Sequence, residues 1–198
     1  MATLREGRVS RKTGETDIQT TLILGTSGRF EGATGIGFFD HMLSAMARHG
    51  GMYITLACKG DLNVDGHHTV EDIGLCLGEA LDIALGQRRG IARFAEAAVP
   101  MDEALARVTL DVSGRPFLAF ACDALPPMIG DFDAQLVVEF LRAFAQKAKL
   151  TLHAKTRGDN GHHIVEALFK ALGRALKLAT VIEDDSPEAQ VPSTKGAL

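Results

Sequence analysis

The sequence predicts an α+β fold of two pseudo-symmetric lobes that arose by internal duplication, each lobe a small mixed β-sheet with helices on one face. Two observations predict it. Two histidine doublets are each followed by a carboxylate at the same distance, as HHTVE at residues 67–71 and HHIVE at residues 162–166. Strand-like alternation and helix-like spacing of apolar residues also follow one another in the same order in both halves. We therefore expect one compact body built from two related halves.

Other segments of the two halves align at offsets of about 86 to 98 residues, which indicates an old duplication with altered loops. We place residues 1–198 in a single domain, with lobe 1 at about 8–92, lobe 2 at about 104–182 and a C-terminal tail at 183–198. The aligned segments are SGR at 27–29 with SGR at 113–115, IGFFD at 36–40 with IGDFD at 129–133, HMLSAMAR at 41–48 with EFLRAFAQ at 139–146, and TL at 55–56 with TL at 151–152.

The elements of lobe 1 follow from the spacing of its apolar residues. Alternation of Ile18, Leu22 and Leu24 is typical of a half-buried strand, and the glycines that follow indicate turns. Farther on, a segment of helical composition ends at Gly50-Gly51, and apolar residues then recur at three- and four-residue steps. The expected elements are a strand at 17–25, turns over 25–37, a helix at 41–48, a strand at 52–58 and an amphipathic helix at 68–85.

Lobe 2 repeats this pattern. Its expected elements are strands near 104–112 and 116–122, a helix near 133–147, a strand near 149–155 and a helix near 162–179. The segment 183–198 has the composition of a mobile tail. Within that tail, Ser193-Thr194-Lys195-Gly196 is a small cationic, hydroxyl-rich patch that could close over an anion.

Composition excludes several classes of protein. The 198 residues are 46% hydrophobic and 23% charged with a net charge of −4, which is typical of one globular domain and argues against a nucleic-acid partner. No apolar run reaches about 18 residues, and the first 17 residues lack the apolar core of a secretory signal, so we expect no membrane partner. Cys58, Cys76 and Cys122 form no Cys-x-x-Cys pair, which favours free thiols in a cytoplasmic protein.

The two doublets carry the chemical argument. On a helix, a histidine and a glutamate four residues apart share a face, whereas the second histidine of the doublet is turned by about 100°. One doublet can therefore serve two metal ions, and two related doublets could build two sites of imidazole and carboxylate ligands. Such ligands without thiolate suit Mn, Fe, Zn or Ni. The alternative is that each doublet is a chance pair at a solvated helix start, which recurrence in both lobes disfavours.

Five motifs resemble those of the imidazoleglycerol-phosphate dehydratase family, in its monofunctional form, and the similarity extends from about Arg8 to Leu198. This resemblance implies two related α+β lobes, two Mn²⁺ per subunit and a homo-oligomer of 24 subunits. The motifs are GFFDHML at 37–43, DGHHTVED at 65–72, SGRP at 113–116, GDNGHHIVEALFK at 158–170 and PSTKG at 192–196.

The implied reaction is that of a hydro-lyase in histidine biosynthesis, which removes water from imidazole glycerol phosphate to give imidazole acetol phosphate. The proton that is lost lies on a carbon with no adjacent carbonyl, so it is not acidic enough for ordinary abstraction. Because the leaving hydroxyl lies beside the imidazole, a metal-bound imidazolate can expel it through a diazafulvene-like intermediate. A carboxylate base then takes the proton, and the enol tautomerises to the ketone.

The resemblance also implies roles for individual residues. One metal would take His41, His68, His162 and Glu166, and the other would take His67, Glu71, His163 and residue 139. Glu15 matches the family's acid/base carboxylate and is expected to reach a neighbouring subunit's site, with Glu71 and Glu166 as the other candidate catalytic carboxylates. Taken alone, Glu15 would be a solvated loop charge. The small-molecule phosphate substrate is expected to contact Glu15, His41, His49, His67, Arg93, Arg115, Lys170, Ser193, Thr194 and Lys195.

Glu139 departs from the family pattern, in which many members have a histidine at this helix position. Either Glu139 replaces that histidine as an oxygen ligand, or it is a solvated helix charge. Apolar neighbours on both sides favour the first, since an unpaired carboxylate among them would cost several kcal/mol in desolvation. Two other functions remain as alternatives, a dinuclear metallohydrolase and a metal-binding cage protein. The latter would not need the cations Arg93, Arg115 and Lys195.

Overall fold

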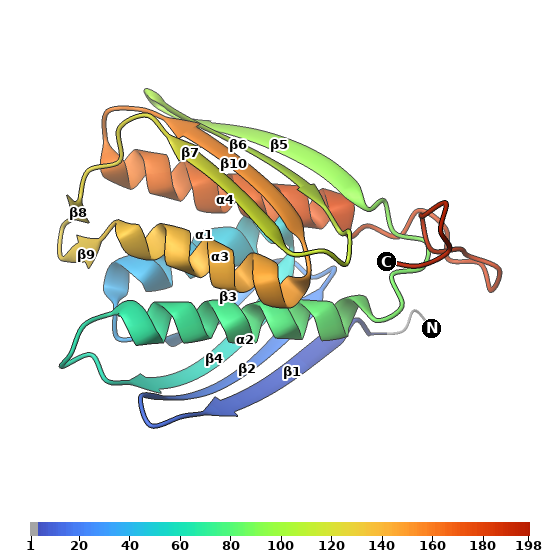
Figure 1. Cartoon of the computed structure of the whole chain (residues 1–198), viewed down its shortest axis with the longest axis horizontal. Coiled ribbons are helices and arrows are strands. Elements are labelled where there is room, and N and C mark those ends of the chain that lie inside the picture. Colours follow the sequence, from blue (N-terminus) through green and yellow to red (C-terminus); the bar gives the residue numbers. More distant parts are fainter. Residues whose placement is uncertain (1–3) are drawn as a thin grey trace.

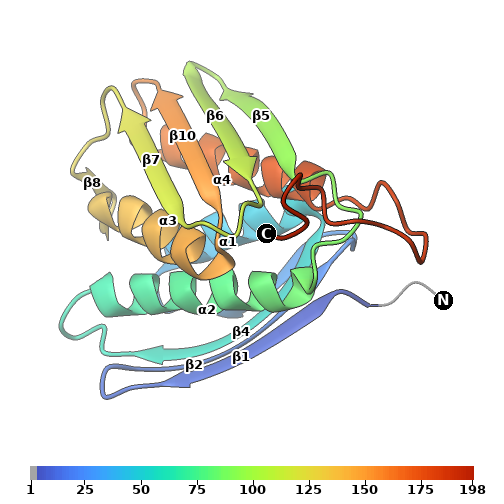
Figure 2. The same ribbon diagram turned by 45° about the vertical axis from the view of Figure 1, so that its right-hand side comes forward.

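The structure is a computed structural model that describes residues 4–198. The chain folds into four layers. Residues 1–3, where the segment searched for a secretory signal begins, lie outside the described residues. Two four-stranded sheets form the outer layers, and four helices lie between them (Figure 1; Figure 2). Each sheet therefore carries its helices on one face, and the α+β prediction is confirmed. Among the described residues, no helix is long and apolar enough to cross a membrane.

The two sheets have the same topology. The first has the order β1-β2-β4-β3 and the second β5-β6-β10-β7, and in each the last pair is parallel while the other pairs are antiparallel. Lobe 1 contains β1 (Glu6–Lys12), β2 (Thr16–Leu24), β3 (Arg29–Ala33), α1 (Gly37–Gly50), β4 (Met52–Gly60) and α2 (His67–Leu85). Lobe 2 contains β5 (Phe94–Met101), β6 (Ala104–Asp111), β7 (Phe117–Cys122), α3 (Gln135–Ala148), β10 (Thr151–Arg157) and α4 (Gly161–Ala179). A short hairpin of β8 (Met128–Ile129) and β9 (Phe132–Asp133) precedes α3.

The helices also correspond between the lobes. Helices α1 and α3 both have 14 residues, and α2 and α4 both have 19. His41 and Glu139 are each the fifth residue of their helix, as the predicted repeat requires. The proposed match of 36–40 with 129–133 is wrong in part, because Phe39 and Asp40 lie in the first turn of α1 whereas Phe132 and Asp133 form β9.

Glycines allow the helices of the two lobes to pack closely against one another. Helix α2 packs on α3 and α1 on α4. A Cβ on Gly78 of α2 would lie 2.5 Å from the carbonyl oxygen of Phe144 in α3. A Cβ on Gly173 of α4 would lie 2.4 Å from the carbonyl oxygen of Met46 in α1. These close approaches fix α1 against α4 and α2 against α3, which positions the side chains at their N-terminal ends.

Besides the short hairpin of β8 and β9, three strands were not predicted, and all three lie at edges of the four-stranded sheets. In β1 only Gly7 is buried, so its side chains carry no apolar alternation. Strand β5 has three alanines among its eight residues and contains Pro100, and proline is tolerated mainly in edge strands. Strand β3 lies in the segment predicted as turns, and Gly32 permits its contact with Leu56 of β4, because a Cβ there would meet the Leu56 carbonyl oxygen at 2.2 Å.

The C-terminal segment, whose composition is typical of a mobile tail, makes defined backbone contacts. Its backbone pairs with the loop before β5, where the Gly90 N–H donates to the Gln190 carbonyl at 3.0 Å and the Glu183 N–H donates to the Gly90 carbonyl at 2.7 Å. Ala189 is buried against this loop. The tail is therefore held beside the start of β5 (Figure 2).

Candidate active site

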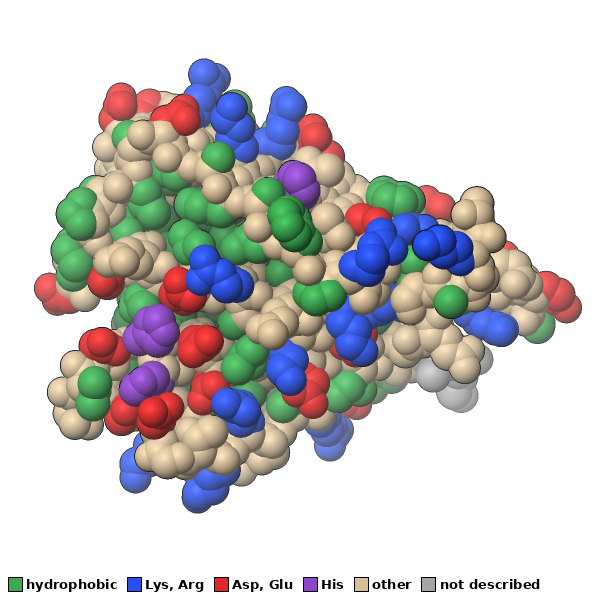
Figure 3. Space-filling view, viewed as in Figure 1, with side chains coloured by type: hydrophobic (Ala, Val, Ile, Leu, Met, Phe, Trp, Pro, Cys, Tyr) green, Lys and Arg blue, Asp and Glu red, His purple; other side chains and the backbone are tan. Residues whose placement is uncertain are grey.

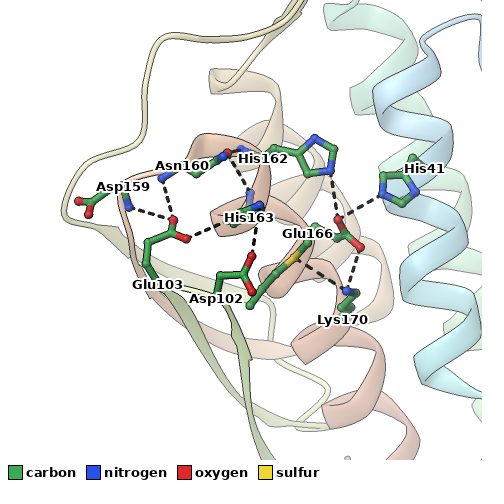
Figure 4. Close-up of polar contacts among 10 residues, drawn as sticks. His41, Asp102, Glu103, Asp159, Asn160, His162, His163, Glu166 and Lys170 are labelled. Carbon is green, nitrogen blue, oxygen red and sulfur yellow. Dashed lines mark hydrogen bonds and ion pairs between the residues drawn. The ribbon is translucent and has the colours of Figure 1, made fainter.

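Three predicted ligands meet where α1 packs on α4. The Nε2 atoms of His41 and His162 lie 3.3 and 3.1 Å from Oε2 of Glu166, and the three donor atoms lie within 4.8 Å of one another (Figure 4). His162 and Glu166 share a face of α4, as the i,i+4 spacing predicts. Two imidazoles and one carboxylate that converge on one point form a donor set for a divalent ion.

The charge of Glu166 is stabilised on both sides. The Lys170 ammonium lies 2.8 Å from Oε1, on the side away from the histidines. Burial raises the pKa of Glu166, but hydrogen bonds from Lys170 and His41 outweigh burial and hold this pKa below its ordinary value. Glu166 is therefore anionic at neutral pH.

The second lobe-related set lies where α2 packs on α3. The Nε2 of His67 lies 3.9 Å from Oε2 of Glu71. His67 and Glu139 line one small hollow of about 150 Å³. Glu139 accepts a hydrogen bond of 2.5 Å from Arg142 and keeps about 28% of its side chain exposed. Glu139 corresponds to His41 in the repeat, but among the described residues the only group of three or more potential ligands whose donor atoms lie within 4.8 Å of one another is the first set.

The remaining two histidines of the doublets point elsewhere. Nδ1 of His68 lies 3.0 Å from Asp61. Nδ1 of His163 lies 2.9 Å from Glu103, as Figure 4 shows. These hydrogen bonds raise the pKa of both imidazoles, and the bond from His163 lowers the pKa of Glu103 to about 2. An imidazole that donates Nδ1–H to a carboxylate keeps Nε2 for a metal. Neither histidine joins the predicted partners on its own chain.

Sequence reasoning missed Asp61 and Glu103. Glu103 lies in the turn between β5 and β6, 60 residues from His163 along the chain, and it also accepts the N–H groups of Asp159 and Asn160. Contacts between such distant segments leave no local pattern. Asp61 follows β4 seven residues before His68, so proximity alone could have suggested it.

Glu15 lies in the turn between β1 and β2, beside the start of α2. Its side chain is 54% exposed, and Oε1 lies 3.6 Å from Nε2 of His68. Glu15 is thus brought to a predicted metal ligand, although the two residues are far apart in sequence.

The predicted phosphate contacts gather at the other end of lobe 2. Arg93 forms a bidentate pair with Asp111, at 2.7 and 3.2 Å, and donates to the Pro192 carbonyl at 2.7 Å. Arg115 lies 3.8 Å from the same Asp111, and Ser193, Thr194 and Lys195 follow Pro192 directly. Figure 3 shows Lys and Arg side chains gathered beside the tail, and histidines among carboxylates at the far ends of α2 and α3. Sequence reasoning had not included Asp111.

Lys170 and His49 lie apart from this cationic group. Lys170 is the partner of Glu166, and His49 lies exposed at the end of α1. Partial burial and then the charges of Lys170 and Arg174 lower the pKa of His49. Arg93 precedes β5, and His163 lies beyond the other end of this strand. The cationic group and the histidines are therefore separated by the length of the eight residues of β5, roughly 25 Å. A small phosphate substrate cannot span them on one chain.

A family model, curated sequences and solved structures that are similar to this chain all carry the same family name. The model of a family described as imidazoleglycerol-phosphate dehydratase matches residues 34–176. A protein of that name from Carboxydothermus hydrogenoformans is 51% identical over 98% of this chain and 100% of its own length. One from Moorella thermoacetica is 51% identical, with 98% of each chain covered.

Solved structures agree. The imidazoleglycerol-phosphate dehydratase of Staphylococcus aureus has a TM-score of 0.81 at 35% identity, with 89% of this chain and 99% of that chain covered. The enzyme from Pyrococcus furiosus, solved in complex with (S)-C348, has a TM-score of 0.78 at 39% identity, with 96% and 100% covered. Similarity of this extent includes both lobes and both doublets.

Proposed function

The chain belongs to the imidazoleglycerol-phosphate dehydratase family of hydro-lyases in histidine biosynthesis, and from this premise we propose that its dehydration reaction depends on two divalent metal ions, Mn²⁺ by preference. The observation that carries the proposal is the approach of the Glu166 carboxylate to within 3.1 and 3.3 Å of two imidazole nitrogens. Two imidazoles with a charged carboxylate and no thiolate fit Mn²⁺ or Fe²⁺ better than softer ions.

Two donor sets would hold the two ions. His41, His162 and Glu166 form the first, and His67, Glu71 and Glu139 form the second. His68 and His163 belong to neither set, and each has Nδ1 hydrogen-bonded to a carboxylate. We therefore propose that these two imidazoles complete metal sites with other copies of the chain. The predicted assembly of 24 subunits would supply such copies.

The distance between the cationic group and the histidines also supports a site that is completed by other copies of the chain. Arg93, Arg115 and Lys195 would bind the substrate phosphate, because paired guanidinium groups and an ammonium suit a dianion. The imidazole end of the substrate would then meet metal ligands from a neighbouring copy. Glu15, which is exposed beside His68, is in a position to exchange a proton with a substrate held between copies.

A bound divalent ion would supply charge stabilisation to the substrate imidazole while the neighbouring hydroxyl departs. This chain's residues supply the remaining functions. The cations fix the phosphate and thereby the orientation of the carbon chain. Glu15 removes the proton from carbon and returns it during tautomerisation. The diazafulvene-like intermediate stays a prediction.

The test is an assay of metal-depleted protein. Full-length protein is treated with a chelator, dialysed, and supplied with imidazole glycerol phosphate with and without Mn²⁺. We expect formation of imidazole acetol phosphate to disappear on depletion and to return with Mn²⁺, and we expect light scattering to report a change in particle size. Mock-treated protein is the control.

Three outcomes would contradict the proposal. Full turnover by protein with no measurable metal would exclude metal dependence. Release of inorganic phosphate without ketone would instead favour the metallohydrolase. Metal uptake with no product of either kind would favour the metal-binding cage.

Glu139 offers a separate prediction. Glu139→Ala is expected to lower metal content by one ion per subunit, because it removes one donor of the second set. Glu139→His is expected to restore that ion, since it recreates the donor present at His41. Elemental analysis of dialysed protein measures both. Arg142→Gln is the matched control, because it removes the partner of Glu139 and leaves the carboxylate. Two ions per subunit in Glu139→Ala would return Glu139 to the exposed helix charges.

A further inference from the structure

A buried carboxylate with no role in the chemistry above lies next to a predicted metal ligand. Asp72 follows Glu71 in α2, and only 5% of Asp72 is exposed. Its Oδ1 accepts a hydrogen bond of 2.9 Å from Nε of Arg11, and its Oδ2 accepts one of 2.5 Å from the hydroxyl of Thr16. Both donors belong to the β1–β2 hairpin, one on each side of Glu15. Asp72 thus ties both sides of the Glu15 turn to α2.

The turn between these two donors is held by bonds of its own. The Thr13 hydroxyl accepts from the N–H groups of Glu15 and Thr16, at 3.1 and 3.0 Å. The Thr13 N–H donates to the Thr16 carbonyl at 2.9 Å, and the Glu15 carbonyl accepts from the Asp61 N–H at 3.1 Å. These bonds fix the shape of the turn and leave the Glu15 side chain free. The side-chain hydrogen bonds that join the two strands of the hairpin to α2 are those of Arg11 and Thr16 to Asp72.

Helix α2 carries the groups with which Glu15 has to cooperate. His67, His68 and Glu71 occupy its first turns, and Glu15 already approaches His68 to 3.6 Å. Asp72 lies on the same stretch of helix. A link from Asp72 to the hairpin therefore sets the position of the Glu15 carboxylate relative to the predicted ligands.

The duplicated lobe provides an internal comparison. When the two doublets are aligned, Asp72 of α2 corresponds to Ala167 of α4, which is fully buried. A helix of the same length packs on its sheet in lobe 2 without a carboxylate at this position. Packing therefore does not require Asp72, and burial of a carboxylate carries a desolvation cost. The carboxylate occurs in the lobe whose hairpin carries Glu15.

We propose that Asp72 is a positioning residue that holds the β1–β2 hairpin, and with it Glu15, at the working distance from the metal ligands of α2. The proposal rests on the function proposed above for Glu15. It acts through geometry, since Asp72 itself touches neither ligand nor substrate.

The test compares Asp72→Asn with the wild-type enzyme and with Glu15→Gln. Asn keeps the shape of the side chain but weakens the bond from Arg11, so we expect the turn to shift. A shift near 1 Å should lower kcat by about 10- to 100-fold, with KM and metal content changed less than about twofold. If Asp72 acts through Glu15, Asp72→Asn should cause no further loss of kcat in the Glu15→Gln background.

A second readout does not depend on turnover. Hydrogen exchange of the amides of Glu15 and Thr16 should become faster in Asp72→Asn, because the hairpin is released from α2. Thr16→Val removes the other link from the hairpin side, and it keeps the test available if Asp72→Asn does not fold. Asp82→Asn is the matched control, because Asp82 lies on the same helix in a pair with Arg88 and Lys149, far from Glu15.

Several results would overturn the proposal. These are unchanged amide exchange in both variants, a kcat within about twofold of wild type, or an equal loss of kcat from Asp72→Asn with and without Glu15. Loss of metal from Asp72→Asn would also overturn it, because Asp72 would then support the ligands instead of the hairpin. Full turnover by Glu15→Gln, by contrast, overturns the role proposed for Glu15 itself.

Discussion

Glu15→Gln is expected to lower kcat by about 10² to 10⁴-fold while metal content and substrate binding are largely kept. The structure gives the reason for this separation of effects. The turn is held through its backbone and through the Thr13 hydroxyl, while the Glu15 side chain is 54% exposed. Gln preserves the size of the side chain and removes only its ability to take a proton. Stability should therefore be close to that of the wild type.

The measurement is steady-state turnover of the metal-loaded oligomer, together with substrate binding under conditions where no product forms. Glu79→Gln is the matched control, because Glu79 is an exposed glutamate of α2 distant from the turn. It should leave kcat unchanged. A Glu15→Gln enzyme that works near the wild-type rate would move proton transfer to Glu71 or Glu166.

The sequence predicted the parts of the fold that are buried on one side. Helix α2 is an example, since Val70, Ile73 and Leu77 recur at helical spacing and all three are fully buried. Strand β1 is the opposite case, because only Gly7 of its seven residues is buried. Its place in the sheet depends on pairing with β2, and burial left no periodic pattern to detect.

In the candidate site, too, contacts within one helix could be predicted and contacts between distant segments could not. Helical spacing predicted that each doublet pairs its first histidine with the glutamate four residues on. In the structure the distance from Nε2 of the histidine to Oε2 of the glutamate is 3.1 Å for His162 and Glu166, and 3.9 Å for His67 and Glu71. The carboxylates that orient the second histidines could not be predicted so directly. Glu103 reaches His163 from a different hairpin, and its contact depends on how β5 and α4 pack. Local sequence patterns carry no information on such tertiary contacts.

The second large effect is expected from Glu166→Gln, which should remove one metal ion per subunit, abolish measurable turnover and destabilise the metal-free protein. Glu166 accepts contacts from two imidazoles and from Lys170, and its side chain is 11% exposed. Its lowered pKa means that the carboxylate is charged at neutral pH, so the amide loses both the charge-assisted bond to Lys170 and an anionic ligand. The lost bond should cost about 1.5 to 3 kcal/mol of unfolding free energy. Metal affinity should fall by more than the roughly 10- to 100-fold that loss of an outer partner causes.

Glu71→Gln separates the expected loss of a metal ion from the expected loss of stability. Glu71 holds the corresponding place in lobe 1, but its side chain is 45% exposed, and its contact with His67 is a looser one of 3.9 Å. Its substitution should therefore remove one metal ion per subunit with little change in the melting temperature of the metal-free protein. Elemental analysis and thermal melting of chelated samples measure the two effects independently. If Glu166→Gln kept both ions, the donor set at the α1–α4 contact would not be a metal site, and the charge of Glu166 would serve Lys170 alone.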